Sequence, residues 1–360
     1  MKIGLIRRQF SASGGAELYV QRLVTGLIQR GHEPHLFAQS WEGLAEGAVF
    51  HQVPVQGNRA TRNLLFAEAV RDQIGQAGLH CVLSLERTLR QDVYRAGDGL
   101  HRVWLERRRE FSPWWKRPFI GLGAFHSNML KLEAQTLDPA NTGHIIVNSE
   151  MVRQEILEHH KFPKERIHLI RNGINTERIR TGNRINSRKT FGINPDEFVV
   201  AFIGSGWERK GLHFLINALQ LLPHSMPIRL LVAGKGRRPS DAPPNSIFTG
   251  PIANIESAYA AADLFVTLPM YEPSANVVAE ALVAGLPVVT SIQNGAAELL
   301  QSGVNGTIVD NPADAVSVSK AIQAWFQRRN ETRPGAIDQK SLSIERNVDE
   351  TLQLLESVAR

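Results

Sequence analysis

The sequence lacks the features that mark disulfide-rich, zinc-binding or membrane-spanning proteins. Cys81 is the only cysteine among 360 residues, which excludes an internal disulfide framework and argues against a structural zinc site. No apolar run approaches the roughly 18 residues needed to cross a bilayer. The segment MKIGLIRRQF has too short an apolar run for an export signal and is typical of a buried first strand. We therefore expect a soluble protein of a reducing compartment.

Length and charge predict two domains and an anionic partner. A chain of 360 residues exceeds the roughly 250–300 at which single cores usually stop growing. The net charge of +6 is uneven, because residues 1–175 hold 23 Lys and Arg against 17 Asp and Glu, whereas residues 176–360 hold 18 of each. A basic first half favours nucleic acid, phosphorylated lipid or a membrane surface as partner.

Short apolar runs alternate with helical patterns along most of the chain. Residues 2–6, 32–39, 80–86 and 144–150 predict strands, and residues 18–31 a helix. Strand–helix alternation restarts at Phe198 and runs to residue 291, whereas residues 101–135 show no clean period. We predict an α/β protein with two Rossmann-like domains that face each other across a cleft. The expected domains are residues 1–171 and 172–342, followed by an amphipathic helix, 343–360, that could pack back toward the first domain.

A glycine-rich loop, GSGWERKG at 204–211, follows a predicted strand and opens a helix. Backbone N–H groups at such a helix start can meet a phosphate, and Arg209 and Lys210 add two cations. The spacing matches neither the dinucleotide-binding nor the P-loop fingerprint. Taken alone, the loop is therefore better explained as a tight turn with solvated charges.

Glu272 and Glu280 stand with seven residues between them, where a loop turns into a helix. Backbone donors around Ser274–Val277 at the helix start favour anionic or hydroxyl-rich ligands. Glu280 could accept hydrogen bonds from vicinal hydroxyls such as a ribose diol, because a carboxylate accepts in bidentate fashion. Taken singly, each glutamate is better explained as an exposed turn residue or a solvated helix residue.

Together these segments resemble the signature of the group 1 retaining, nucleotide-sugar-dependent glycosyltransferases, which have the GT-B fold. The motifs that carry the likeness are GGAE (14–17), NGIN (172–175), IGSGWERKG (203–211), FTG (248–250), AYAAADLFVTLPMYEP (258–273), the Glu272–Glu280 segment and SGVNGTIV (302–309). They occur in the family's order and cover nearly the whole chain. Within the family, AQSWEG (38–43) and DVYRAGDGLHRVW (92–104) are most similar to lipopolysaccharide core glucosyltransferases. The co-occurrence of the motifs favours functional roles for the loop cations and both glutamates.

The resemblance implies a role for each residue. Arg209 and Lys210 would hold the donor diphosphate, because Gly204-Ser205 stands where many relatives have Gly-Arg. Glu272 and the backbone amides after Pro273 would hold the hydroxyls of the transferred sugar. Glu280 would bind the ribose, the FTGPI turn (248–252) would flank the uracil, and Gly15 would let the backbone approach the diphosphate. The donor-binding set is Gly15, Ser205, Ile252, Ser274, Ala275, Asn276 and Glu280.

Asp98 is the implied acceptor-side carboxylate, which would polarise the attacking hydroxyl as a general base. The alternative is a turn-forming Asp before Gly99, and His101 is as readily packed as in contact with a sugar. The catalytic set is therefore Asp98, Glu272, Arg209 and Lys210.

The expected reaction is retaining transfer of a hexose, with glucose preferred, from a UDP-sugar to a lipopolysaccharide core or related glycolipid. Breaking the anomeric C–O bond develops negative charge on the diphosphate, which fixed cations stabilise. The sequence has no Asp-x-Asp cluster for Mg²⁺, so we expect neither a metal nor a cofactor beyond the donor. The alternatives are a GT-B sugar-nucleotide epimerase, or a nucleic-acid-binding protein, for which no binding motif is found.

The segment HRVWLERRREFSPWWKRPF (101–119) holds three of the six tryptophans and six Lys or Arg against two Glu. Tryptophans and basic residues together favour an anionic membrane surface. We therefore expect a cytoplasmic enzyme, peripheral on the inner face of the cytoplasmic membrane. The same residues could instead bind acceptor phosphates, or form a basic surface helix with the tryptophans in the core.

Overall fold

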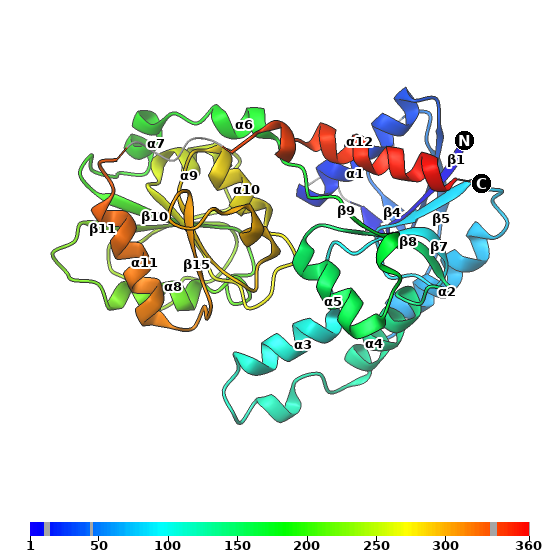
Figure 1. The fold of residues 1–360 in the computed structure, drawn as a ribbon, viewed down its shortest axis with the longest axis horizontal. Coiled ribbons are helices and arrows are strands. Elements are labelled where there is room, and N and C mark those ends of the chain that lie inside the picture. Colours follow the sequence, from blue (N-terminus) through cyan, green and yellow to red (C-terminus); the bar gives the residue numbers. More distant parts are fainter. Residues whose placement is uncertain (11–14, 44–45, 332–336, 360) are drawn as a thin grey trace. The chain divides into compact units, whose positions relative to one another are not determined.

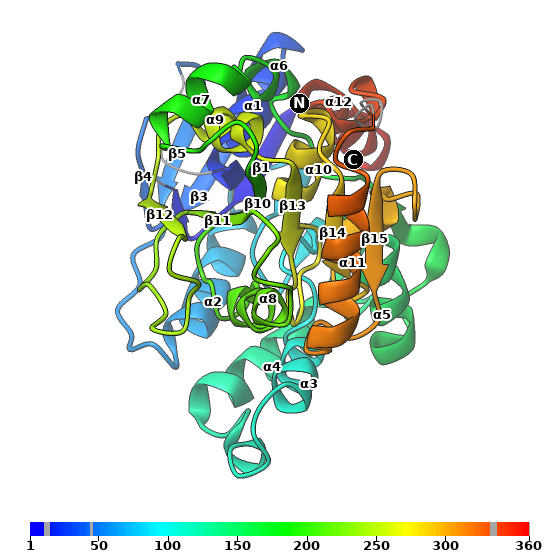
Figure 2. The ribbon, with the colours of Figure 1, turned by 90° about the vertical axis from the view of Figure 1, so that its left-hand side faces the viewer.

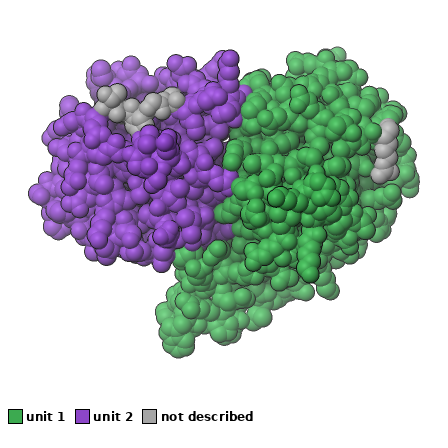
Figure 3. Space-filling model, viewed as in Figure 1, with its two compact units in different colours: residues 1–173, 344–360 green, residues 174–343 purple. Residues whose placement is uncertain are grey.

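The computed structural model describes residues 1–10, 15–43, 46–331 and 337–359. The chain forms two compact units, which Figure 3 distinguishes by colour. Unit 1 contains residues 1–173 and 344–360, and unit 2 contains residues 174–343. The chain therefore leaves unit 1 once and returns to it with its last helix.

Unit 1 is built on a seven-stranded parallel sheet in the order β5-β3-β1-β6-β7-β8-β9. The strands of unit 1 are β1 Lys2–Ile6, β2 Gln9–Phe10, β3 Glu33–Ala38, β4 Ser40–Trp41, β5 Val49–Gln52, β6 Cys81–Ser84, β7 Gln91–Arg95, β8 Thr142–Val147 and β9 Ile167–Leu169, of which β2 and β4 pair separately. Its helices are α1 Gly15–Gln29, α2 Arg62–Ile74, α3 His101–Glu110, η1 Arg117–Phe119, α4 Ala124–Thr136, α5 Glu150–His160, η2 Lys164–Arg166 and α12 Ile344–Val358.

The C-terminal helix α12 packs on α1, as Figure 1 shows. Leu352 and Leu355 are buried in a core cluster that also contains Leu23 and Leu27 of α1. At the surface of the same contact, Arg30 Nη2 lies 2.8 Å from Asp349 Oδ1. Burial of this apolar face explains why an amphipathic helix at the end of the chain belongs to the first unit.

Unit 2 is built on a six-stranded parallel sheet in the order β12-β11-β10-β13-β14-β15 (Figure 2). Its strands are β10 Phe198–Ile203, β11 Ile228–Ala233, β12 Ile247–Gly250, β13 Leu264–Thr267, β14 Val288–Ser291 and β15 Gly306–Val309. Its helices are α6 Thr176–Arg180, α7 Arg184–Thr190, α8 Leu212–Gln220, α9 Ile255–Ala261, α10 Asn276–Val283, η3 Gly295–Leu299, α11 Ala315–Gln327 and η4 Lys340–Leu342. When the strands of each sheet are numbered in chain order, the sheet of unit 2 reads 3-2-1-4-5-6, the order of Rossmann folds, and the sheet of unit 1 reads the same with β9 added as a seventh strand. The prediction of two Rossmann-like domains is confirmed.

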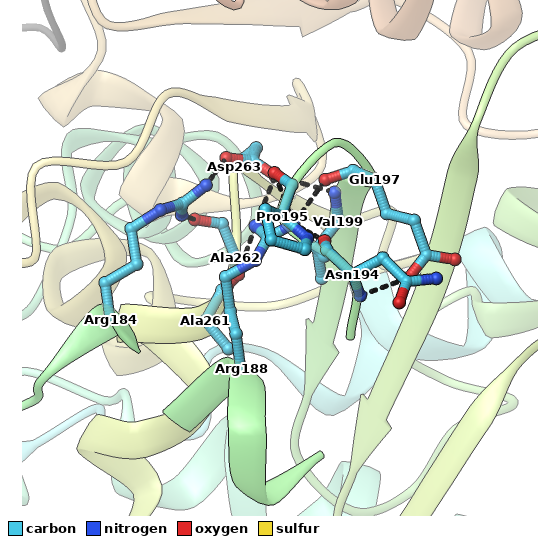
Figure 4. A network of polar contacts seen from close by, with 9 residues as sticks. All are labelled: Arg184, Arg188, Asn194, Pro195, Glu197, Val199, Ala261, Ala262 and Asp263. Carbon is cyan, nitrogen blue, oxygen red and sulfur yellow. Dashed lines mark hydrogen bonds and ion pairs between the residues drawn. The ribbon is translucent and has the colours of Figure 1, made fainter. Parts of the chain in front are cut away.

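A buried arginine ties α7 to the sheet of unit 2 (Figure 4). The Arg188 side chain on α7 is 7% exposed, and its guanidinium lies 3.2 Å from Asp263 Oδ2, just before β13. Arg188 also donates to the carbonyls of Asn194 and Ala261. Asp263 accepts in addition from Arg184 Nη2 at 2.6 Å and from the Val199 backbone N–H at 2.8 Å. The carboxylate thereby joins α7, β10 and β13.

We predict that Asp263→Asn lowers the free energy of unfolding of unit 2 by about 3 kcal/mol, because it leaves the Arg188 charge buried without its counter-ion. Urea denaturation of the full chain measures this loss. Glu331→Gln is the control, because it breaks an exposed ion pair with Arg328 and should cost at most about 1 kcal/mol. Equal losses for the two variants would contradict the assigned importance of Asp263.

Candidate functional site

The donor-side candidates gather where the strand order of unit 2 reverses. β10 and β13 are neighbours in the sheet, although β11 and β12 come between them in the chain. Ligands of open parallel sheets bind outside the carboxyl ends of the strands at such a switch point. The loop after β10 carries Arg209 and Lys210, and the segment after β13 carries Glu272. Fold topology therefore brings these three residues to one edge.

Arg209, Lys210 and Glu272 form a cluster of charges. Arg209 Nη1 lies 2.7 Å and Lys210 Nζ 3.7 Å from the same oxygen, Glu272 Oε2. The Arg209 side chain is 42% exposed, whereas those of Lys210 and Glu272 are 13% and 14% exposed. The cluster thus offers one solvent-facing guanidinium beside two largely covered charges, an arrangement suited to an anion with attached hydroxyl groups.

Backbone hydrogen bonds hold the loops of this cluster together. Met270 N donates to Arg209 O and Leu268 N donates to Lys210 O, both at 3.1 Å. Glu272 N donates to Gln293 O at 2.9 Å, and Gly295 N donates to Glu272 O at 2.9 Å. The three loops after β10, β13 and β14 are therefore one hydrogen-bonded unit.

The start of α10 is stabilised by a side chain from the neighbouring loop. Asn294 Oδ1 accepts from Ala275 N at 3.2 Å and from Ala296 N at 3.1 Å. Asn294 Nδ2 in turn donates to Thr290 Oγ1. Ala275 is buried, and Ser274 and Asn276 on either side of it are partly exposed. The structure thus places all three predicted donor-binding residues at the helix start, next to Glu272.

Glu280 on α10 is not a solvated helix residue. Tyr259 Oη donates to Glu280 Oε2 at 2.6 Å. Burial raises the pKa of the Glu280 carboxyl, although the Tyr259 hydrogen bond and the positive charges of Lys210 and Arg178 oppose the rise. Burial likewise raises the pKa of the Tyr259 hydroxyl, and the Glu280 charge adds to that rise. Lys210 is therefore electrostatically linked to both predicted glutamates.

The remaining donor-side candidates lie around this cluster or outside the described chain. Ser205 Oγ accepts from Lys235 N at 3.1 Å, so its hydroxyl bonds to the loop after β11. Ile252 packs against the core of unit 2 just beyond β12. Residues 248–250 belong to that strand, so the predicted FTGPI turn begins only after Gly250. Gly15 is the first residue of α1, and residues 11–14 before it lie outside the described part of the chain.

In unit 1, Asp98 is exposed in a turn after β7, where Gly99 N donates to Ala96 O at 3.2 Å. It is therefore a turn residue, as the alternative interpretation required, but charged groups surround it. Burial and the Asp98 charge raise the pKa of Glu86, which follows β6, against the opposing charges of Arg7 and Arg8. Glu86 Oε1 accepts from Arg8 N at 3.3 Å. The carboxyl ends of β1, β6 and β7 thus carry a mixed charge cluster.

His101 is packed rather than open. Its Nε2 lies 3.0 Å from His126 Nδ1 on α4, and the two rings stack. Burial, followed by the charge of Arg87, lowers the pKa of His101 to about 4, so the ring is neutral near pH 7.

The basic segment 101–119 forms α3 and η1, and the ribbon extends here away from the sheet of unit 1 (Figure 1). The exposed fractions are 76% for Trp114, 56% for Trp115 and 72% for Phe119, and Leu122 just beyond is 65% exposed. The alternative that places the tryptophans in the core is therefore wrong for Trp114 and Trp115, whereas Trp104 is partly buried. We call residues 101–123 the basic arm.

The described residues contain neither a membrane-spanning helix nor a metal-binding group of side chains. No helix in the described ranges is long and apolar enough to span a membrane. Within the same ranges, no group of three or more His, Cys, Asp or Glu side chains could hold a metal ion.

Sequence comparisons relate the chain to sugar-transferring enzymes. A family profile described as Glycosyltransferase Family 4 matches residues 13–178, and one described as Glycosyl transferases group 1 matches residues 197–328. The lipopolysaccharide glucosyltransferase WaaG of Escherichia coli is 24% identical over 327 residues, which cover 86% of this chain and 85% of WaaG. D-inositol 3-phosphate glycosyltransferase of Mycobacterium sp. (strain KMS) is 31% identical over 195 residues, which cover 49% of this chain and 43% of that protein.

Solved structures share the fold along nearly the whole chain. The crystal structure of WaaG aligns with a TM-score of 0.78 at 21% identity, covering 98% of this chain and 99% of WaaG. HepE of Anabaena, solved in complex with UDP and glucose, aligns with a TM-score of 0.74 at 18% identity, covering 99% and 100%.

Proposed function

Because this chain belongs to the group 1 glycosyltransferases and has their two Rossmann-like domains, we propose that it moves glucose from UDP-glucose to a lipopolysaccharide core or related glycolipid. Two kinds of support favour this donor and acceptor. WaaG, a relative covered over 85% of its length, is a lipopolysaccharide glucosyltransferase. The structural neighbour HepE was solved with UDP and glucose.

The observation that carries the proposal is the cluster of Arg209, Lys210 and Glu272 at the switch point of unit 2. In this proposal the two cations stabilise the charge that develops on the departing diphosphate. When the donor binds, Arg209, the more exposed of the two, breaks its ion pair with Glu272 and pairs with the diphosphate instead. Glu272 then accepts hydrogen bonds from the sugar hydroxyls, and the anomeric configuration is retained.

In this proposal each unit binds one of the two substrates. Unit 2 binds the donor, with Glu280 on the ribose and Ile252 beside the uracil. Unit 1 binds the acceptor, whose hydroxyl Asp98 polarises as general base. The basic pair supplies the leaving-group charge compensation that a metal ion would otherwise supply, so we propose a metal-independent reaction.

We also propose that the enzyme works in the cytoplasm, peripheral on the inner face of the cytoplasmic membrane. The basic arm exposes Trp114, Trp115 and Phe119, and Arg108 and Lys116 of the same arm are exposed as well. Exposed tryptophans favour the bilayer interface, and cations favour anionic headgroups. A lipid-linked acceptor would lie on the same surface.

Transfer itself is the first test. We expect the protein to add one hexose from UDP-glucose to a heptose-terminated glycolipid, detected by mass spectrometry, with or without EDTA. Lys210→Ala should lower kcat about 10²–10³-fold, because it removes a fixed charge at the leaving group. Lys189→Ala, which removes an exposed cation of α7, is the matched control. Stabilisation of the protein by RNA but by no sugar nucleotide would overturn the proposed transferase activity. An absolute need for Mg²⁺ would overturn the proposed metal independence.

For the ribose assignment, we predict that Glu280→Gln weakens UDP binding about tenfold or more, because it removes a charge-assisted acceptor. Calorimetry measures the affinity, and Glu331→Gln is the control carboxylate. Burial raises the Glu280 pKa, and the bound form must be the carboxylate. Wild-type affinity should therefore fall on acidification before the ordinary titration range of glutamic acid is reached, whereas the Glu280→Gln variant should not show this fall. Equal affinities at neutral pH would refute the assignment.

For the membrane proposal, we predict that the protein floats with anionic vesicles and that added salt releases it. Replacement of Arg107, Arg108 and Arg109 by Ala should weaken binding roughly hundredfold, at about 1 kcal/mol for each cation. Trp114→Ser with Trp115→Ser should weaken it further. The control Lys189→Ala with Lys320→Ala removes exposed cations of unit 2 and should bind as wild type does. Binding that is absent or insensitive to salt would count against the proposal.

A further inference from the structure

A buried ion pair in unit 1 has no role in the function proposed so far. Arg87, which follows β6, places Nη2 3.1 Å from Oε2 of Glu133 on α4. The two side chains are 11% and 1% exposed. Such a pair gives little net stability, because desolvation of both charges offsets their attraction. Because the pair adds little net stability, we ask what else it does, and the answer lies in its hydrogen bonds to the backbone of residues 99–102.

Glu133 caps the N-terminus of α3, where the hydrogen-bonded residue Arg102 stands 31 residues before it in the chain. Leu100 stands at the N-cap of α3 and has no polar side chain to offer. Glu133 instead accepts from the first amides of α3, with His101 N donating to Oε2 and Arg102 N to Oε1, the latter at 3.1 Å. A carboxylate at this position satisfies helix-terminal donors and complements the helix dipole.

Arg87 binds the carbonyl of Gly99, just before the amides that Glu133 caps. Its Nη2 donates to Gly99 O at 2.6 Å, and Gly99 is held in the left-handed region at φ 63°. Burial lowers the pKa of the Arg87 guanidinium, but the charges of Tyr94, Glu133 and Asp98 outweigh it and raise the pKa. The guanidinium is therefore permanently charged within electrostatic reach of Asp98.

We propose that Arg87 and Glu133 are positioning residues for Asp98. The pair fixes the carbonyl of Gly99 and the amides of His101 and Arg102, so the turn that carries Asp98 is fixed immediately on its C-terminal side. This inference rests on the proposed role of Asp98 at the acceptor. It assigns to α4 a function in catalysis, since misplacement of a reacting group by about 1 Å can cost about 10²-fold in rate.

The kinetic test is a double-mutant cycle between Glu133→Gln and Asp98→Asn, with UDP-glucose and a heptose-terminated glycolipid as substrates. Glutamine at 133 keeps the shape but cannot supply two carboxylate acceptors while facing Arg87. We expect Glu133→Gln to lower kcat about tenfold or more without changing the KM for UDP-glucose, and to have no further effect when Asp98→Asn is already present. Glu158→Gln, an exposed carboxylate on α5, should leave kcat unchanged. Additive effects of the two substitutions would overturn the proposal.

A second measurement does not depend on transfer. Hydrogen exchange of Glu133→Gln should show faster exchange in residues 96–104 than wild type, with the sheet of unit 1 unchanged. Unchanged exchange at 96–104 would overturn the positioning role whether or not the wild type transfers sugar. If the wild type transfers no sugar while exchange at 96–104 responds as expected, the proposed function fails and the positioning of the turn stands. The variant Arg87→Met with Glu133→Leu replaces the ion pair by apolar groups, should fold, and should show the same faster exchange.

Discussion

Close approach of two backbone segments is the constraint on which the donor-side cluster depends. The loop after β10 can pair with the segment after β13 only because residue 211 is glycine. Gly211 has φ 76°, and a Cβ added there would lie 1.9 Å from Leu268 O. Any side chain would push the segments apart and break the hydrogen bonds that hold Arg209 and Lys210 beside Glu272. The glycine therefore sets how closely the cations can approach the carboxylate.

Local sequence determines most of unit 2, which explains how much of it could be predicted. Each strand is a short apolar run followed by a loop and a helix, and parallel pairing then places successive loops at one edge. The spacing of Glu272 and Glu280 likewise lies within one loop and one helix. The partners of these residues were not predictable, because Tyr259 and Asn294 come from other elements. Helical spacing alone predicts that the Glu280 carboxylate lies in solvent. In the structure it accepts a hydrogen bond from the Tyr259 hydroxyl instead, and Tyr259 belongs to another helix.

Unit 1 was harder to predict because the structure around Asp98, the proposed acceptor-side residue, depends on contacts between distant segments. The region 101–135 shows no clean period because α3 buries only Val103 and Leu105. The helix begins where a glutamate from α4 caps it, and no local cap residue marks that position in the sequence. The candidate Asp98 could be found from the family motif, but Arg87 and Glu133 could not. A buried charge pair has no signature in composition or spacing until the fold brings its members together.

The two proposed kinds of recognition, of an anionic membrane surface and of a nucleotide-sugar, rely on cations in different parts of the protein. The basic arm carries its cations with exposed tryptophans beyond the end of α3. In unit 2, Arg209 and Lys210 lie beside Glu272, and the charge of Lys210 also acts on Glu280. Screening limits exposed charges to about 8 Å at physiological salt, so the charge of the arm acts mainly on what touches the arm. Arg209 and Lys210 share the carboxylate of Glu272, and in the proposed function they become available when the donor diphosphate competes with it. Part of the excess positive charge in the first half of the sequence is therefore concentrated on the basic arm, where the proposed membrane contact lies.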